Sequence, residues 1–412
     1  MSYNRLDITR KFLKIRARKC SRCGFRIYFA LLKEVGIMER KVKYITKLEL
    51  LDKLSSKEKE ELKEVTDKFA FRTNNYYNSL INWKDPDDPI RRIVIPTTEE
   101  LEVWGKLDAS NESKYMKVHG LEHKYPDTAL LLVTDVCGIY CRFCFRKRLF
   151  MNDNDEVARD VSEGLEYIRN HPEINNVLLT GGDPLVLATF KLEKILKALA
   201  DIPHVRIVRI GTKMLAVNPF RVIDDPELLD LFDWFNTHTG KKLYLMNHFN
   251  HPRELTKEAK EAIGLVQKTG TTLTNQTPIL KGINDDVQTL KELLEELSFI
   301  GVPPYYVFQC RPTAGNKTYS TTIEETIDLV EEVRSRMSGL GARVRYVMSH
   351  ETGKIEILGK TSELVFFRYH RAANPDNAGK FMVYRRNPSA HWFDDYTELV
   401  EEYRVETSEQ CV

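Results

Sequence analysis

The hydrophobic pattern after Asp127 alternates short apolar runs with amphipathic segments. The apolar runs predict six β-strands, at 129–134, 176–180, 205–211, 242–246, 271–276 and 305–309. Between them, leucine and isoleucine recur at helical spacing in 191–200 and 287–299, as in Leu290, Leu293, Leu294 and Leu297. Six β–α units with short connections predict an α/β fold, in which helices cover a parallel sheet that forms a (β/α)6 barrel or part of one.

Outside these units the pattern is less regular. Apolar positions at Leu48, Leu51 and Leu54, before a Lys/Glu-rich run, predict a helix over 45–68. Three prolines between 86 and 96 then predict an extended connection. We therefore expect a basic arm at 1–43, a helical and extended region at 44–122, the barrel core at 123–320 and a C-terminal segment at 321–412.

Chemically reactive residues follow the predicted strands. Because the carboxyl ends of parallel strands form one face of a barrel, and active sites are built there, residues that are far apart in sequence are expected to meet at one mouth. In chain order they are Cys137, Gly181-Gly182-Asp183, Thr212-Lys213, Asn247-His248 and Cys310-Arg311.

Three of the seven cysteines form one motif. Cys137, Cys141 and Cys144 are spaced Cys-x3-Cys-x2-Cys within LLLVTDVCGIYCRFCFRKRLF. A fully ligated 4Fe–4S cluster takes four cysteines, so three leave one iron open for S-adenosylmethionine (SAM), which an open iron can help to cleave to a carbon radical. A zinc site is the main alternative, but zinc normally takes four ligands and no second cysteine pair follows nearby. A disulfide would be unusual without a secretory context.

The amino-acid composition limits the possible locations and partners of the protein. The chain has 412 residues, 42% of them hydrophobic and 30% charged, with a net charge of +2. No apolar run approaches the ~20 residues of a membrane helix, and no signal peptide is evident, so we expect a cytoplasmic protein. The near-balanced charge does not favour binding to nucleic acid.

The segment 1–26 carries nine Lys/Arg, one acid and the pair Cys20–Cys23. A solvated tail is the favoured interpretation of this segment, with an RNA or partner contact as the alternative.

Long ordered strings identify a family. They include DPDDPIRRIVIPT at 85–97, HKYPDTALLLVTDVCGIYCRFCFRKR at 123–148, LLTGGDPL at 178–185, NHFNHPRELT at 247–256, NQTPILKGIND at 275–285 and PYYVFQC at 304–310. Over about 45–396 the chain resembles the lysine 2,3-aminomutase family of radical SAM enzymes. The resemblance implies an enzyme that moves an amino group between the α and β carbons of an amino acid. It also implies a 4Fe–4S cluster, SAM, pyridoxal 5′-phosphate (PLP), an electron donor such as flavodoxin or ferredoxin, and a homo-oligomer.

The resemblance also implies roles for individual residues. The three cysteines match the cluster ligands, and Arg146 matches the arginine that receives the substrate α-carboxylate, which suits a guanidinium fork. Lys354 matches the lysine that binds PLP as a Schiff base. The remaining matches are Gly181, Gly182, Asp183, Asn247 and His248 along SAM, and Lys124 and Lys213 at the PLP phosphate.

The chain departs from the family near PLP. A long glycine run precedes the family lysine, whereas here SHETGKIEILG at 349–359 keeps only Gly353 before Lys354. The family tends to carry arginine at the positions of Lys124, Thr128 and Lys213. The family's structural zinc cysteines near the C-terminus have no evident match; Cys411 stands alone.

A further departure concerns the substrate. Lysine enzymes place one aspartate directly after the cysteine that matches Cys310 and another seven residues before the PLP lysine, and both hold the substrate ammonium. Here these positions are Arg311 and Val347. We therefore expect an acidic or neutral substrate rather than lysine, with Arg311 at the side chain. The alternatives are a PLP-independent radical SAM enzyme that acts on another metabolite or peptide, and a non-catalytic iron–sulfur or RNA-binding protein.

Overall fold

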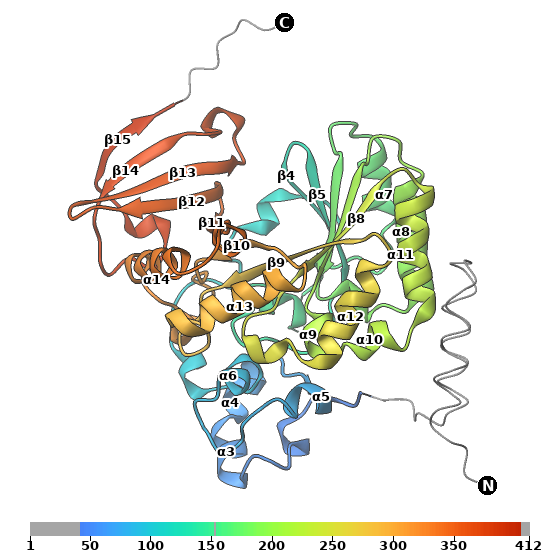
Figure 1. Ribbon diagram of the computed structural model, residues 1–412, viewed down its shortest axis with the longest axis horizontal. Helices are drawn as coiled ribbons and strands as arrows, with labels where there is room; N and C mark the ends of the chain where they lie inside the picture. The colour runs from blue at the N-terminus through green and yellow to red at the C-terminus, as the bar shows by residue number, and fades with distance from the viewer. Residues whose placement is uncertain (1–41, 152–153, 405–412) are drawn as a thin grey trace, which may run out of the picture.

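A computed structural model describes residues 42–151 and 154–404. Its centre is a thirteen-stranded sheet in which the strands run in sequence order from β3 to β15 (Figure 1). The basic arm, Cys20, Cys23 and Cys411 lie outside the described residues, so the expectations for them stay predictions. None of the helices in the described part is long and apolar enough to cross a membrane.

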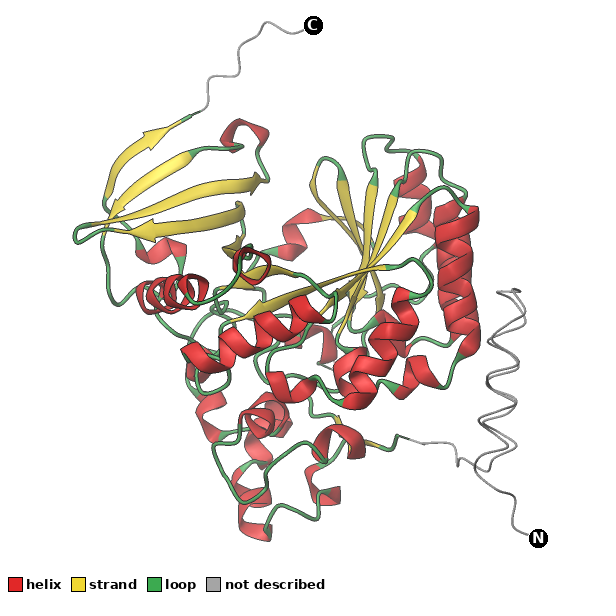
Figure 2. Cartoon of the chain, viewed as in Figure 1, coloured by secondary structure: helices red, strands yellow, loops and turns green. Residues whose placement is uncertain are grey.

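The parallel part of the sheet confirms the six predicted strands. They are β5 (Thr128–Thr134), β6 (Asn176–Gly181), β7 (Ile207–Thr212), β8 (Lys242–Asn247), β9 (Thr272–Pro278) and β10 (Pro304–Phe308). A seventh strand, β11 (Arg345–His350), which we did not predict, pairs in parallel with β10. The parallel strands curve into an open partial barrel (Figure 2).

Helices connect and cover these strands on the outside of the barrel (Figure 1). The longer ones are α7 (Ser162–Arg169), α8 (Thr189–Ala200), α11 (Pro226–His238), α12 (Lys257–Gln267), α13 (Val287–Phe299) and α14 (Ile323–Ser335). Three are short: α9 (Met214–Val217), α10 (Phe220–Ile223) and α15 (Gly339–Ala342). The predicted helices at 191–200 and 287–299 correspond to α8 and α13.

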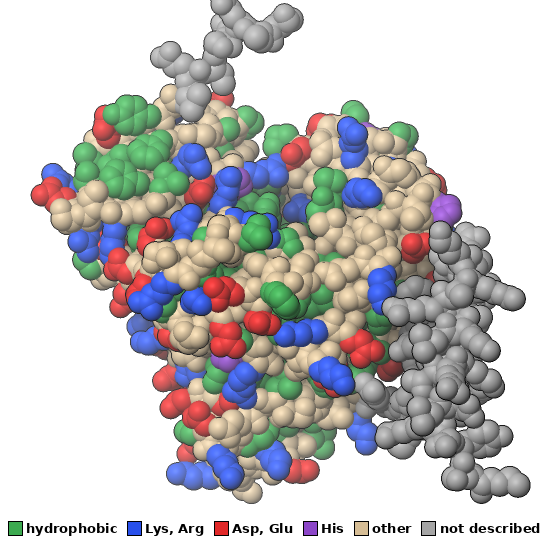
Figure 3. Space-filling view, in the orientation of Figure 1, with side chains coloured by type: hydrophobic (Ala, Val, Ile, Leu, Met, Phe, Trp, Pro, Cys, Tyr) green, Lys and Arg blue, Asp and Glu red, His purple; other side chains and the backbone are tan. Residues whose placement is uncertain are grey.

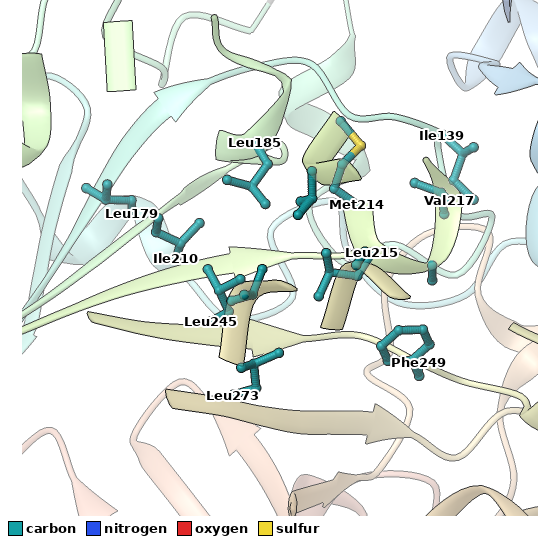
Figure 4. Close-up of a cluster of buried hydrophobic side chains, with 14 of the residues drawn as sticks. Ile139, Leu179, Leu185, Ile210, Met214, Leu215, Val217, Leu245, Phe249 and Leu273 are labelled. Atoms are coloured by element: carbon teal, nitrogen blue, oxygen red, sulfur yellow. The ribbon is translucent and has the colours of Figure 1, made fainter. Parts of the chain in front are cut away.

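The helix-facing side of the strands forms the main hydrophobic core. Leu179, Ile210, Leu245 and Leu273 are register partners on four neighbouring strands and form one apolar row. In Figure 4 this row faces Leu185, Met214 and Leu215, which follow β6 and β7. Because strand side chains alternate between faces, the positions between these residues face the barrel interior.

Antiparallel strands extend the sheet at both ends. On one side β4 (Leu121–Tyr125) and β3 (Met116–Val118) follow β5 outward. On the other side β12 (Gly353–Lys360), β13 (Leu364–Ala372), β14 (Phe381–Arg385) and β15 (Leu399–Tyr403) continue from β11. The C-terminal segment is therefore continuous with the barrel sheet, and it brings Lys354 to the edge of the barrel.

The region before the barrel differs from two expectations. The single helix expected over 45–68 is wrong: the structure has β1 (Tyr44–Ile45), then α3 (Ser56–Glu61) and α4 (Lys63–Lys68). Ser55 caps α3 through a reciprocal capping box with Glu58, so the helix begins there rather than at Ile45. After β2 (Thr73–Asn74) and α5 (Asn75–Asn78), the proline-rich connection contains a helix, α6 (Pro89–Val94), because Asp88 caps it and Pro89 suits the first helical position.

Candidate active site

The interior face of the barrel is polar, unlike its helix-facing side. Thr180 on β6 bonds to Arg146, Arg209 on β7 bonds to Asn176, and Gln276 on β9 bonds to His248. Barrel interiors are normally filled by bulky apolar side chains. Polar side chains at these positions therefore indicate a ligand site.

The three motif cysteines lie on the loop that follows β5. The N-terminal region holds this loop: the Tyr140 amide donates to Arg72 O at 2.9 Å and the Arg142 amide donates to Ile93 O at 2.9 Å. The Arg142 guanidinium also forms a buried ion pair with Glu100, with a closest distance of 2.8 Å. The residues before the barrel thus form a support for the cysteine loop.

The donor set fits an iron–sulfur cluster. All three cysteines are free thiols, and burial raises the pKa of each. Such thiols need nearby positive charge to ionise, and a coordinated metal supplies it. Within 42–151 and 154–404, no three His, Cys, Asp or Glu side chains converge on a single ion. The three cysteine ligands of a cluster bind three different irons, so they do not need to converge in this way.

The glycine–acid turn after β6 packs directly against the cysteine loop. A Cβ on Gly182 would lie 2.3 Å from Val136 O, and one on Gly181, at φ +101°, would lie 2.5 Å from Thr134 O. Only glycine therefore lets the turn approach the loop this closely. Asp183 accepts bonds from the Lys213 amide (2.7 Å), the Thr212 hydroxyl (2.8 Å) and the Leu185 amide (3.0 Å). It joins the ends of β6 and β7, and its contact with SAM stays a prediction.

Asn247 and His248 lie at the carboxyl end of β8, on the same face of the barrel as the turn that carries Asp183. The Asn247 Oδ1 atom is buried and has no hydrogen-bond partner among the described residues, so it is available to a ligand. Burial, with Lys213 nearby, lowers the pKa of His248 to about 3, so this imidazole is neutral. Lys213 Nζ lies 2.5 Å from Glu254 Oε1 and 2.6 Å from His248 O. Its ammonium therefore has a carboxylate partner, and its role at a phosphate stays a prediction.

Arg146 is buried next to two carboxylates. Its Nη2 atom lies 2.9 Å from Glu112 Oε1 and 3.6 Å from Glu122 Oε1, and its Nη1 atom donates to the Thr180 hydroxyl at 2.7 Å. Burial opposes ionisation of Glu112, but Arg146 and Arg148 outweigh it and lower the pKa of Glu112 to about 2. Burial and the nearby Glu112 raise the pKa of Glu122 to about 8. A substrate carboxylate would have to share Arg146 with Glu112.

Arg311, unlike Arg146, has a hydrogen-bond donor without a partner in the described part of the chain. It follows β10, and its Cζ atom lies 3.9 Å from the centroid of the Phe145 ring. The Nη1 atom is buried and finds no hydrogen-bond partner within the described ranges. Burial lowers the pKa of Arg311 to about 10, yet it stays charged at neutral pH. A buried, unsatisfied cationic donor is costly unless a ligand completes its hydrogen bonds.

Lys354 lies at the start of β12, above two aromatic rings. Its Nζ atom is 4.2 Å from the centroid of the Tyr306 ring and 5.4 Å from that of Phe308. Tyr306 also lines an open pocket of about 360 Å³ with Arg345 and His370. Burial, followed by the nearby cations Arg209, Arg371, Arg311 and Lys124, lowers the pKa of Lys354 to about 7. A substantial fraction of this amine is therefore unprotonated and nucleophilic at neutral pH.

Comparison with known proteins shows which family the chain resembles. Residues 131–297 match the model of the radical SAM superfamily. A protein of Aquifex aeolicus (strain VF5), named "Putative L-lysine 2,3-aminomutase", is 84% identical over 371 residues, which are 90% of this chain and 99% of that protein. The L-lysine 2,3-aminomutase of Clostridium subterminale is 36% identical over 73% of this chain and 72% of its own length. The glutamate 2,3-aminomutase of Clostridioides difficile (strain 630) is 38% identical over 72% of this chain and 70% of its own.

The chain belongs to the lysine 2,3-aminomutase family of radical SAM enzymes. It is therefore a radical SAM aminomutase, an isomerase that moves an amino group. Membership of the superfamily implies SAM and a 4Fe–4S cluster, which fits the cysteine loop. The relatives include proteins named for two different substrates at similar identity, so identity alone does not assign the substrate of this aminomutase.

In this aminomutase, side-chain hydrogen bonds fix the turn before Lys354. His350 is hydrogen-bonded through Nδ1 to the Thr352 hydroxyl (2.7 Å) and through Nε2 to Asp394 (3.0 Å). The Thr352 hydroxyl also pairs with the Tyr369 hydroxyl at 2.8 Å, and Lys124 Nζ donates to His350 O at 2.7 Å. The residues that stand where the family has glycines therefore hold the lysine strand in place.

The structure also places residues at the site that the sequence did not indicate. Arg209, Arg371, Glu112 and Glu122 are all close to predicted site residues. One signal was available for Arg209: an arginine between apolar residues of a predicted strand. Arg371 and Glu112 lie outside the predicted strands, and no local pattern marked them.

Proposed function

We propose that this enzyme is a 2,3-aminomutase for an amino acid with an anionic side chain, glutamate or aspartate ahead of alanine-like residues, and that it uses PLP held at Lys354. When bound, PLP supplies a conjugated ring that stabilises an unpaired electron next to the migrating nitrogen. The protein's contribution is to bind the acid groups of the substrate, to present a neutral lysine amine and to exclude competing cations.

The observation that carries the substrate assignment is the unsatisfied Nη1 donor of Arg311. This buried donor lacks a hydrogen-bond partner among the described residues, whereas the nearby Arg146 is bonded to Glu112. A substrate carboxylate would complete the hydrogen bonds of Arg311 in a strong, charge-assisted geometry. An ammonium at the same place would lie against a cation, which costs several kcal/mol in a buried site.

The second specificity position favours the same conclusion. Val347 is fully buried on β11 and is the register partner of Phe308, whose ring lies near Lys354. A valine offers no charge to a lysine ammonium, and it replaces the aspartate that lysine enzymes carry there. A site that combines the Arg311 cation with this apolar residue suits a short dicarboxylate or a small neutral side chain.

The surroundings of Lys354 favour the PLP part of the proposal. Four basic side chains from four different segments surround this amine and lower its pKa. A neutral lysine next to an excess of positive charge can bind an aldehyde covalently and a phosphate electrostatically at the same place.

The test is anaerobic reconstitution with iron, sulfide, SAM, PLP and a strong reductant, followed by mass spectrometry of β-amino acids from a panel of α-amino acids. We expect β-glutamate from glutamate, or the isomer of aspartate, as the major product. Lysine as the best substrate would contradict the substrate assignment. Full turnover without PLP would contradict the cofactor assignment and favour the PLP-independent alternative.

A further inference from the structure

Lys354 and Arg371 lie opposite each other on two neighbouring strands, next to a register shift between Lys354 and Ile355. They are register partners on the antiparallel pair β12–β13, so their side chains project from the same face of the sheet. Like charges that are directly opposite on neighbouring strands destabilise a sheet. The half-buried Lys354 therefore either loses its proton or gains from a nearby anion.

The nearest acid does not supply that compensation for the whole group. Arg371 contacts Asp127, but the side chain of Asp127 is 48% exposed, so water weakens this pair. Arg209, Arg311 and Lys124 add further positive charge around Lys354. In Figure 3, lysine and arginine side chains gather around the hollow between the C-terminal strands and the rest of the barrel.

Arg371 also reaches the position where the family resemblance implies a missing arginine. Its Nη1 atom lies 3.4 Å from the Thr128 hydroxyl at the start of β5. Its guanidinium carbon lies 4.5 Å from the centroid of the Tyr125 ring, and stacking of this kind keeps the planar group oriented. The side chain thus brings a cation from β13 to the location where an arginine at position 128 would begin.

We infer that Arg371 is a phosphate-binding residue of this enzyme, which supplies from β13 the cation that the family carries at the position of Thr128. The inference rests on the proposed use of PLP. The aldehyde and the phosphate arm of PLP are attached to neighbouring ring carbons, so a cation directly across from the reacting lysine is suitably placed for the phosphate. A guanidinium can bind two phosphate oxygens at once.

A purely structural role for Arg371, as the ion-pair partner of Asp127, is the competing explanation. The two roles make opposite predictions for Asp127→Asn. If the ion pair only stabilises the fold, this variant resembles Arg371→Gln. If Arg371 binds phosphate, Asp127→Asn leaves the arginine in place and keeps PLP affinity.

The experiment compares PLP with pyridoxal, which has the same aldehyde but no phosphate. The full-length chain is titrated with each compound, and covalent attachment at Lys354 is measured by absorbance and by mass spectrometry after borohydride reduction. The matched control is Arg368→Gln, because Arg368 lies on the same strand and pairs with Glu356 at 2.7 Å. Near-ultraviolet circular dichroism checks that every variant keeps its fold.

At a pH where the Lys354 amine is neutral in both proteins, we expect Arg371→Gln to weaken PLP attachment by roughly 10- to 100-fold, the range for loss of charge-assisted hydrogen bonds, and to leave pyridoxal attachment within about 2-fold of the unmodified protein. Asp127→Asn and Arg368→Gln should keep PLP affinity. Adding Thr128→Arg to Arg371→Gln should restore much of the lost PLP affinity, because it returns a cation to the same place from β5.

Three outcomes would overturn the inference. Equal weakening of PLP and pyridoxal would show an effect on Lys354 rather than on phosphate. Unchanged PLP affinity in Arg371→Gln would remove Arg371 from the site while leaving the proposed function intact. Failure of the unmodified protein to attach PLP at Lys354 would contradict the proposed cofactor and, with it, the role of Arg371.

Discussion

The two sides of the barrel interior differ in how their charged side chains are paired. On the cysteine side, next to β5–β8, Arg146 pairs with Glu112, Lys213 pairs with Glu254, and Asp183 accepts several hydrogen bonds. On the lysine side, next to β10–β13, basic side chains surround Lys354 and Arg311 keeps an unsatisfied donor. The charged groups on the first side are mostly paired within the protein, although Asn247 Oδ1 is left without a partner among the described residues, whereas the second side carries an excess of positive charge.

This difference distinguishes side chains that stabilise the fold from side chains that bind a ligand. Buried ion pairs with complete hydrogen bonding hold a structure in one arrangement, and loss of one partner leaves a costly isolated charge. Buried cations without partners instead store an unfavourable interaction that an anionic ligand relieves. We therefore expect substitutions on the cysteine side to change stability or SAM chemistry, and substitutions on the lysine side to change the affinity for anions.

The largest effect is expected at the cysteine loop. Cys141→Ala should reduce 5′-deoxyadenosine formation from SAM to background, because one iron loses its ligand. Covalent attachment of PLP at Lys354 should persist, because the two sides are independent. Cys310→Ala is the control: this buried cysteine lies outside the motif, and its removal should leave SAM cleavage measurable. Loss of PLP attachment in Cys141→Ala would break the separation between the two sides.

The next effect is on stability. Glu112→Gln removes the charge that compensates the buried Arg146 and Arg148, so we expect the free energy of unfolding to fall by about 3–5 kcal/mol. Asp127→Asn on the lysine side breaks a more exposed pair and should cost about 1 kcal/mol or less. Urea unfolding of both variants measures the difference. Equal losses would contradict the contrast between the two sides.

Lys354 should impose a pH dependence on cofactor attachment. Its pKa of about 7 means that the amine is mostly protonated, and unreactive, below pH 7 and mostly neutral above it. The rate of PLP attachment should therefore rise through a midpoint near pH 7 and level off at higher pH, where the amine is fully neutral. Removal of a neighbouring cation in Arg371→Gln raises the pKa and should move this midpoint to higher pH. A midpoint near pH 10 in the unmodified protein would contradict the inference that burial and nearby cations lower the pKa of Lys354.

A small effect is expected at Thr180. Thr180→Val removes the hydroxyl that accepts a hydrogen bond from Arg146 at 2.7 Å, and the net cost of such a bond is about 1 kcal/mol, or more when a charged donor loses its partner. Thr274→Val, on an interior position of β9, serves as a comparison, because its hydroxyl bonds only weakly to Met246 Sδ at 3.6 Å. Thermal unfolding should separate the two variants.

The sequence could predict much of the barrel because its strands and helices carry strong periodic patterns. The six apolar runs became β5–β10, and the leucine repeat at 287–299 became α13. The strand β11 was not predicted because Arg345, Ser349 and His350 dilute its apolar residues. The long helix over 45–68 was wrong because the capping box at Ser55 starts a new helix inside the apolar pattern.

The candidate site was predictable only where a motif marked it. The cysteine motif and the residues after each strand are local signals, and parallel-barrel geometry brings them to one face. Arg371 reaches Lys354 through the register of an antiparallel pair, which no local sequence signal fixes. The pairing of Arg146 with Glu112 joins residues that are 34 positions apart, and the sequence pattern alone did not indicate that this carboxylate turns inward.

The substrate assignment is tested by the ratio of kcat/KM for glutamate to that for lysine, in the unmodified enzyme and in Arg311→Asp combined with Val347→Asp. We expect a ratio well above one in the unmodified enzyme and a ratio below one in the double variant, because the charge at the side-chain end of the site is reversed. A ratio below one in the unmodified enzyme, or a ratio unchanged by the double substitution, would contradict the assignment.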